Sequence, residues 1–127
     1  TSSTFAMSES HESKEIASNW EPFSPARIKE LQAQGTPVFV DFTAKWCLIC
    51  QVNHMVLQTA EDQFNQAGVV RMKADWTKRD PVITEELKKF GRNSVPLYVL
   101  YGSEKENPKI LPQVLTSDIV SNHLNGL

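Results

Sequence analysis

The 127-residue sequence predicts an α/β fold with a central mixed β-sheet flanked by helices. Three observations lead to this prediction. Residues Val38-Phe39-Val40 are apolar at consecutive positions, which is typical of an interior strand covered on both faces. Apolar stretches of strand length alternate along the chain with stretches of helical periodicity. A composition of 40% hydrophobic and 22% charged residues fits one ordinary globular domain.

Pro and Gly residues mark where the predicted elements begin and end. Pro25 follows the N-cap Ser24 and begins the first helix, which ends at Gly35. Pro81 follows Asp80 in the same way at the start of a later helix. The predicted elements are a helix over 25–34, a strand over 38–40, a helix over 47–67 with a break near 59–62, a strand over 69–74, a helix over 81–90, an antiparallel hairpin of 97–101 with 110–111, and a helix over 117–124.

Residues 1–19 differ in composition from the rest of the chain. They are rich in Ser, Thr and Glu, and their few apolar residues bury too little area to offset the entropy of ordering. We expect 1–19 to be a flexible tail or interdomain linker and 20–127 to be a domain that acts as a monomer. The net charge is −2 and the 13 basic residues are scattered, so no nucleic-acid partner is expected.

The only two cysteines lie in Trp46-Cys47-Leu48-Ile49-Cys50, where the interior strand leads into a helix. A disulfide across so short a loop stabilises a fold by only about 2 kcal/mol, so the pair is better suited to thiol–disulfide exchange. Unpaired N–H groups and the dipole of the helix N-terminus favour the thiolate of Cys47, which becomes the attacking sulfur. Lys45 adds a small attraction. Cys50 lies one turn deeper and is predicted to resolve the mixed disulfide.

Metal binding is the alternative for this segment. Cys47, Cys50 and His54 offer three ligands, the last two on one helix face. No second Cys/His pair supplies a fourth ligand, so we favour redox chemistry and expect no bound metal. His54 is either a neighbour that tunes the sulfur atoms or an ordinary, partly packed histidine.

Asp41 and two further residues are candidates for supporting roles. Asp41 lies six residues before Cys47 in an apolar strand, where burial disfavours the charged carboxylate. It can accept the Cys50 proton during resolution, or simply cap a turn at the strand end. Trp46 can cover the disulfide where a partner docks, or serve only in packing. Pro96 begins a strand, and the composition by itself favours a trans peptide bond there.

Residues 40–50 together with Val95-Pro96 resemble the thioredoxin-like family, with coverage from about Trp20 to Leu124. Residues 73–77 and 90–98 resemble, more narrowly, the C-terminal domain of the bacterial thiol:disulfide interchange protein DsbD family. The resemblance implies a thioredoxin-like fold, with Cys47 as the exposed nucleophile, Cys50 as the resolving cysteine and Asp41 as the buried carboxylate. It also implies a cis Pro96 facing the disulfide, which leaves the Val95 backbone free to pair with an incoming strand.

The same resemblance implies where the domain acts in a series of electron transfers. It would be periplasmic, tethered to the inner membrane, and would relay two electrons from a membrane-embedded donor domain to an immunoglobulin-like N-terminal acceptor domain or to other periplasmic thiol oxidoreductases. No cofactor beyond the Cys47–Cys50 disulfide is expected. The sequence departs from the family at Gln51, where lysine is common, and at His54, where glutamate is common. The alternatives are a free-standing periplasmic reductase of the cytochrome c maturation type, and a non-catalytic zinc-holding or docking domain.

Overall fold

The central strand of the sheet is β2 (Val38–Thr43), in which all six residues are buried. The computed structural model describes residues 19–103 and 105–127, so the predicted tail lies, except for Asn19, outside the described residues. Nine further helices and strands are described: β1 (Trp20–Pro22), α2 (Pro25–Ala33), α3 (Leu48–Thr59), α4 (Glu61–Ala67), β3 (Val70–Asp75), α5 (Pro81–Lys89), β4 (Leu97–Tyr101), β5 (Lys109–Leu111) and α6 (Ser117–Asn125).

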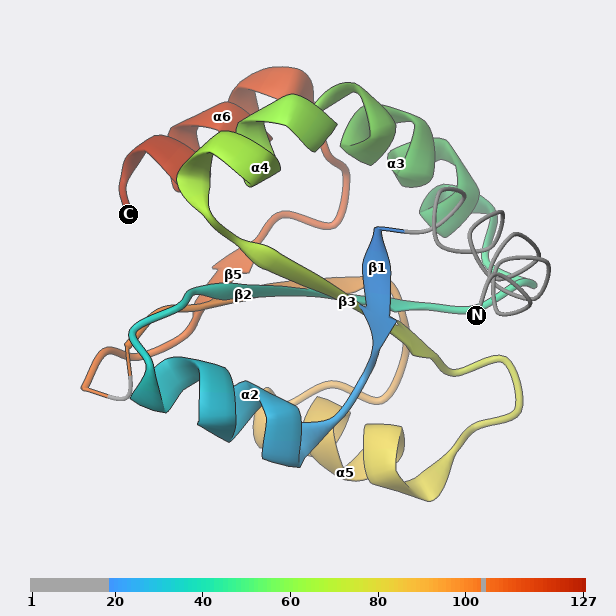
Figure 1. Cartoon of the computed structure of the whole chain (residues 1–127). Helices are drawn as coiled ribbons and strands as arrows, with labels where there is room; N and C mark the ends of the chain where they lie inside the picture. Colours follow the sequence, from blue (N-terminus) through green and yellow to red (C-terminus); the bar gives the residue numbers. More distant parts are fainter. Residues whose placement is uncertain (1–18, 104) are drawn as a thin grey trace, which may run out of the picture.

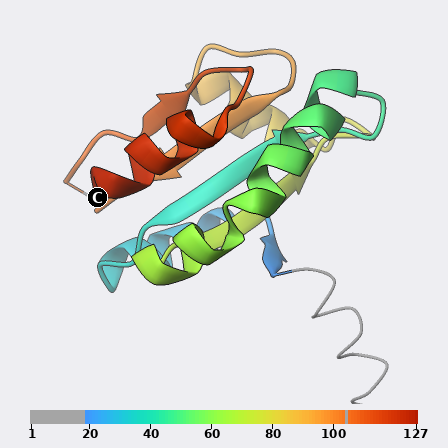
Figure 2. The same cartoon turned by 90° about the horizontal axis from the view of Figure 1, so that it is seen from above.

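The strands form one mixed sheet in the order β1-β3-β2-β4-β5. β3 is parallel to both β1 and β2, whereas β4 is antiparallel to both β2 and β5. α2 and α5 cover one face of the sheet, and α3, α4 and α6 cover the other (Figure 1). The view from above shows α3 and α4 running one after the other across that second face, beside α6 (Figure 2). The predicted α/β fold, a central mixed sheet flanked by helices, is therefore confirmed.

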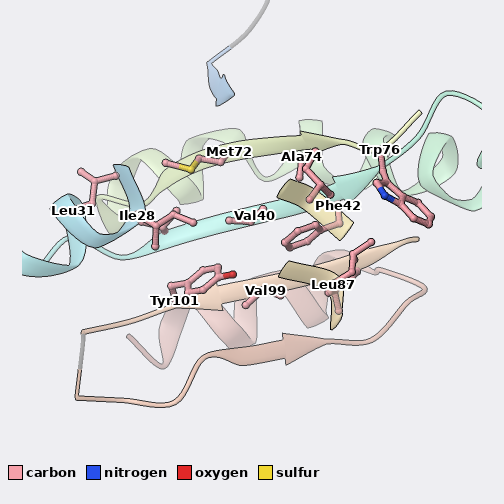
Figure 3. Packing of buried hydrophobic residues seen from close by; sticks show 13 residues of the cluster. Ile28, Leu31, Val40, Phe42, Met72, Ala74, Trp76, Leu87, Val99 and Tyr101 are labelled. Carbon is pink, nitrogen blue, oxygen red and sulfur yellow. The ribbon is translucent and has the colours of Figure 1, made fainter. Parts of the chain in front are cut away.

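The alternation of side chains along β2 divides the core into two parts. Val40 and Phe42 point to the cluster under α2 and α5, which Figure 3 shows from close by. Phe39 points to the other cluster, under α3, α4 and α6. Because side chains on a strand alternate between faces, Asp41 and Thr43 share the Phe39 face. The carboxylate predicted to be functional therefore lies on the side of the sheet that α3 covers.

Local signals place the helix ends as the sequence predicted. The Arg27 N–H donates a hydrogen bond to Ser24 Oγ (3.1 Å) at the start of α2, and Asp80 accepts one from the Val82 N–H (2.7 Å) at the start of α5. Gly68 ends α4 in a left-handed conformation with φ of 70°, which glycine adopts without steric cost. The predicted break in the long helix occurs at Ala60, between α3 and α4.

Two features of the fold differ from the sequence prediction. β1 is a three-residue edge strand that contains Pro22 and therefore has too little periodicity to be recognised. The apolar spacing that predicts α3 includes Leu48, Val52 and Met55, yet these side chains are exposed. Residues three and four positions apart line up on any face of a helix. The spacing therefore predicted that α3 is a helix but not which of its faces is buried. None of the described helices is long and apolar enough to span a membrane.

Candidate active site

The two cysteines form a disulfide at the N-terminus of α3, with their Cα atoms 5.3 Å apart. Cys47 is the N-cap residue of the helix, in extended conformation, and its Sγ accepts a hydrogen bond from the Cys50 N–H (3.2 Å). The Cys47 N–H in turn donates to the Ala44 carbonyl (3.1 Å), which fixes the turn between β2 and α3. The sulfur of Cys47 therefore occupies the position where the helix presents unpaired N–H groups, as predicted.

The cysteines differ in burial in the expected sense. Cys50 is 0% exposed and Cys47 is 8% exposed. Both pack with Ala44 and Val95 in a small apolar cluster separate from the two main ones. The exposed nucleophile that the resemblance implied is thus, in the oxidised form, a largely covered residue, because its side chain caps the helix and is tied to Cys50.

The Val95–Pro96 peptide bond is cis, as the family resemblance implied and contrary to what composition favoured. Pro96 is buried and immediately precedes β4. Val95 packs against the cluster that holds the disulfide, so the bond lies beside the cysteines although it is far from them in sequence.

Asp41 is fully buried, and His54 on α3 is an ionisable neighbour of its carboxylate. The distance from Asp41 Oδ2 to His54 Nε2 is 3.0 Å, and the His54 side chain is 23% exposed. His54 Nε2 also lies 3.4 Å from Thr43 Oγ1. Among the described residues, no donor reaches either Asp41 oxygen in hydrogen-bonding geometry, so His54 and Asp41 form a close polar contact rather than a hydrogen bond. His54 follows Cys50 by one helical turn, which places this pair on the Cys50 face of α3.

Asn53 is a buried polar residue of this region that the sequence analysis missed. Its Nδ2 donates to Tyr98 Oη (2.8 Å) and to the Gln113 carbonyl (2.7 Å), and its Oδ1 accepts from the Leu115 N–H (3.1 Å). Tyr98 is the register partner of Asp41 in the sheet. Burial raises the pKa of the Tyr98 phenol, the Asp41 charge raises it further, and the Asn53 hydrogen bond opposes both. The signal in the sequence was an amide three residues after Cys50, on the helix face that Cys50 shares.

Trp46 is half-exposed and held in place by the loop that follows β3. Its Nε1 donates to the Thr77 carbonyl (3.1 Å), and the Lys45 N–H donates to Thr77 Oγ1 (2.9 Å). The guanidinium of Arg79 lies 5.2 Å from the Trp46 ring centroid and 5.0 Å from that of Trp76. Thr77 and Arg79 are further residues that the sequence analysis missed, since nothing local connects them to the cysteines.

Lys45 was expected to attract the sulfur. Cys47 is held in a disulfide here, so this attraction stays a prediction. The pKa of Asp75 is lowered chiefly by the Thr77 hydroxyl hydrogen bond, and the charges of Lys45 and Lys73 lower it by smaller amounts. Gln51 is exposed and its Nε2 donates to the Ala44 carbonyl (3.4 Å). Within residues 19–103 and 105–127, no three His, Cys, Asp or Glu side chains are arranged to hold a metal ion.

A mixed α/β sheet, a disulfide at a helix N-terminus and a cis proline beside it define a class of protein. The thioredoxin-like family model matches residues 19–103, and the chain belongs to this family. The family and the disulfide support disulfide oxidoreductase chemistry at this site.

Among curated proteins, the chain is similar to the thiol:disulfide interchange protein DsbD of Vibrio cholerae, with 31% identity over 80 residues. It is also similar to thioredoxin H2 of Arabidopsis thaliana, with 25% identity over 84 residues. The matched segments are 62% and 66% of this chain but only 13% and 59% of the two relatives.

Solved structures agree on the fold. The oxidised C-terminal domain of Neisseria meningitidis DsbD has a TM-score of 0.65 at 18% identity, with 84% of this chain and 97% of that one covered. Chloroplastic thioredoxin z gives the same TM-score and identity, with 84% and 92% covered. Trxlp of Edwardsiella tarda has a TM-score of 0.63 at 25% identity, with 82% and 96% covered. The family, the fold and the disulfide together support thiol–disulfide exchange as the chemistry of this chain.

Proposed function

We propose that this domain relays two electrons from a membrane-embedded donor domain to a periplasmic acceptor, by dithiol–disulfide exchange at Cys47 and Cys50. The observation that carries the proposal is the disulfide at the N-terminus of α3, with Cys47 Sγ accepting a hydrogen bond from the helix backbone. The similarity to DsbD supports a redox partner in general. As that partner we propose an immunoglobulin-like N-terminal domain or another periplasmic thiol oxidoreductase. In this proposal residues 1–19 link the domain to a tethered, periplasmic assembly.

The exchange proceeds in two displacement steps. The Cys47 thiolate attacks one sulfur of the partner disulfide, the partner S–S bond breaks, and its second sulfur leaves as a thiolate. Cys50 then loses its proton and attacks Cys47 in the mixed disulfide, which releases the reduced partner and forms the Cys47–Cys50 bond. The partner gains two electrons and two protons, and the donor domain later reduces Cys47–Cys50 by the same steps in reverse.

Asp41 and His54 act on the proton of Cys50 in this proposal. A buried carboxylate on the sheet face under α3 can accept that proton when Cys50 attacks and return it on reduction. His54 lies between Asp41 and solvent, because it contacts the carboxylate at 3.0 Å and is itself partly exposed. An imidazole can take up and release a proton near neutral pH, which suits it to pass the proton outward. This gives His54 a tuning role in place of the family glutamate.

The face around the disulfide supplies the docking contacts. Trp46 is half-exposed and immediately precedes the nucleophile. Val95 packs on the cysteine cluster and precedes the cis bond to Pro96, so its backbone is the proposed partner of an extended segment in the incoming protein.

The roles of the two sulfurs are tested with single variants. Cys47→Ser should abolish the reduction of insulin disulfides, because no nucleophile remains at the helix N-terminus. Cys50→Ala should accumulate a covalent mixed disulfide with the partner, visible on a non-reducing gel and removed by dithiothreitol. A Cys47→Ser protein that reduces insulin at the wild-type rate would overturn the mechanism.

The proton path is tested by Asp41→Asn and His54→Gln. General acid–base assistance contributes about 10²- to 10⁴-fold, so we expect Asp41→Asn to slow release of the mixed disulfide by about 100-fold near neutral pH and to change its pH profile. His54→Gln should have a smaller effect of the same kind, and circular dichroism checks that both variants fold. A wild-type pH profile in folded Asp41→Asn would assign this carboxylate to structure alone.

The similarity to thioredoxin H2 favours a second candidate, a free-standing thioredoxin-like reductase, including the cytochrome c maturation type. Electron donors separate the two: we expect a purified DsbD-type membrane domain to reduce the oxidised chain, and NADPH with thioredoxin reductase to fail. The opposite result would favour the free-standing reductase. A zinc-holding or docking domain would instead bind stoichiometric zinc when reduced, or fail to reduce insulin.

A further inference from the structure

α3 has apolar side chains on two opposite faces, and the described fold covers one of them. The inner face carries Cys50 and Leu57, both buried. The opposite face carries Leu48, Val52 and Met55, which are 81%, 61% and 67% exposed. Their spacing of four and three residues aligns them along one side of the helix. We call these three side chains the outer face of α3.

An exposed apolar helix face of this kind is unusual. Surface helices normally place polar or charged residues outward, and helices that are apolar on all sides are normally buried. The described residues include nine exposed large apolar side chains, of which five lie between Trp46 and Met55. Single exposed apolar residues need no explanation, but a contiguous group marks an interaction site.

The outer face of α3 is continuous with the redox site. Leu48 and Ile49 lie between the two cysteines, and Trp46 precedes them; Ile49 and Trp46 are both half-exposed. A protein that brings a sulfur atom to Cys47 must therefore also cover Leu48. From there, Val52 and Met55 extend the same surface along the next two turns of the helix.

The helix that carries this surface has no charged side chain. α3 contains no Asp, Glu, Lys or Arg. Charged residues of a partner that came to lie on the outer face of α3 would lose water without gaining an opposite charge, which is unfavourable. Apolar residues of a partner would have no such desolvation cost, and their contact with this face would remove apolar surface of both proteins from water.

We propose that the outer face of α3 is a docking surface for a redox partner whose reactive cysteine is flanked on one side by uncharged, apolar residues. This inference rests on the proposed function and deepens it, since it states which sequences around a disulfide are preferred. The outer face of α3 selects the partner through apolar contacts, and the thiol–disulfide exchange takes place at Cys47.

Two synthetic peptides test the preference. Each carries one cysteine as a mixed disulfide with thionitrobenzoate, flanked by Leu, Val and Met in one peptide and by Glu and Ser in the other. The reduced protein releases the coloured thiol from each, and the ratio of the two second-order rate constants is measured. We expect the apolar peptide to react at least tenfold faster than the acidic one. The ratio should fall below about threefold in a Val52→Ser, Met55→Ser double variant.

Leu127→Ser is the matched control, because it replaces an exposed apolar residue at the C-terminus, at the other end of the molecule from the start of α3 (Figure 1). Its ratio should equal the wild-type ratio. Equal rates for the two peptides, or a preference unchanged in the double variant, would overturn the docking inference alone. A reduced wild-type protein that failed to react with free dithionitrobenzoate would instead contradict the proposed function.

Two other occupants are tested on the same protein. Sedimentation that shows a dimer lost in the double variant would assign the outer face to a second copy of the chain. Flotation with phosphatidylglycerol and phosphatidylethanolamine vesicles, lost in the same variant, would assign it to lipid. Either result would overturn the inference.

Discussion

Arg79 has a φ of 58°, in the left-handed region that non-glycine residues rarely adopt. This backbone conformation costs a non-glycine residue about 1 kcal/mol. The guanidinium offsets this cost, because it lies over both Trp46 and Trp76, and each such exposed contact contributes about 0.5–1 kcal/mol. Arg79 thus holds the indole beside the nucleophile at little net cost in stability.

Two substitutions separate the backbone cost from the ring contacts. Arg79→Ala removes the contacts and keeps the unfavourable φ, whereas Arg79→Gly removes the contacts and relieves the backbone. We expect Arg79→Gly to be more stable than Arg79→Ala by about 1 kcal/mol, with Arg79→Gly close to wild type. Urea unfolding measures both free energies. Equal stabilities for the two variants would show that the left-handed conformation carries no cost here.

At the level of elements, the buried side chain of Asn53 connects α3 to two other parts of the molecule. Asn53 makes hydrogen bonds to β4, through Tyr98, and to the segment before α6, through Gln113 and Leu115. All three partners are distant in sequence, so Asn53 fixes the position of the helix that carries the cysteines. Leu57 also packs in the core cluster under α3, α4 and α6. That packing buries apolar area but, unlike hydrogen bonds, does not fix the orientation of the helix.

Asn53→Ala should therefore be strongly destabilising. It leaves buried polar groups without partners, and each such loss costs about 1–3 kcal/mol, so we expect a decrease of about 2–4 kcal/mol in the free energy of unfolding. Gln58→Ala, at an exposed position of the same helix, should change it by less than about 0.5 kcal/mol. Urea unfolding at neutral pH compares them, and similar values for both variants would contradict the anchoring role of Asn53.

At the scale of the whole molecule, the sheet separates two buried clusters and each contains one tyrosine. Tyr98 belongs to the cluster under α3, α4 and α6, and Tyr101 to the cluster under α2 and α5. Burial raises the pKa of both phenols, and for Tyr101 the hydrogen bond it donates to Glu86 Oε2 (2.7 Å) raises it further. The folded protein therefore holds these two protons more tightly than the unfolded chain.

The higher pKa values of the phenols in the folded protein predict how the free energy of unfolding changes at alkaline pH. In the unfolded chain a tyrosine loses its proton near pH 10, so above about pH 10 unfolding releases protons and the free energy of unfolding falls as pH rises. Below that value the stabilisation is fully present. Because the chain has only two tyrosines, we expect tyrosinate absorbance to appear together with the loss of far-ultraviolet circular dichroism. A smooth titration near pH 10 with native circular dichroism would contradict the burial of both phenols.

Much of the architecture was predictable because its signals are local. Ser24, Asp80 and Gly68 each act on the helix end next to them, and their geometry depends on neighbours within a few residues. β1 was missed because three residues with a proline give no periodicity. The side of α3 that faces the core was also not predictable, since Leu48, Val52 and Met55 have the spacing of a buried face.

Local sequence is enough to specify the chemistry of the cysteine pair. Cys47 and Cys50 are separated by two residues at a helix start, so their disulfide and the N–H contact to Cys47 Sγ follow from local backbone geometry. The surroundings of the pair depend on long-range packing, which brings His54 against Asp41, Val95 beside the disulfide, and Thr77 into a hydrogen bond with Trp46. Those contacts join side chains on different elements, and their distances depend on how helices pack on the sheet, which no local pattern in the chain specifies.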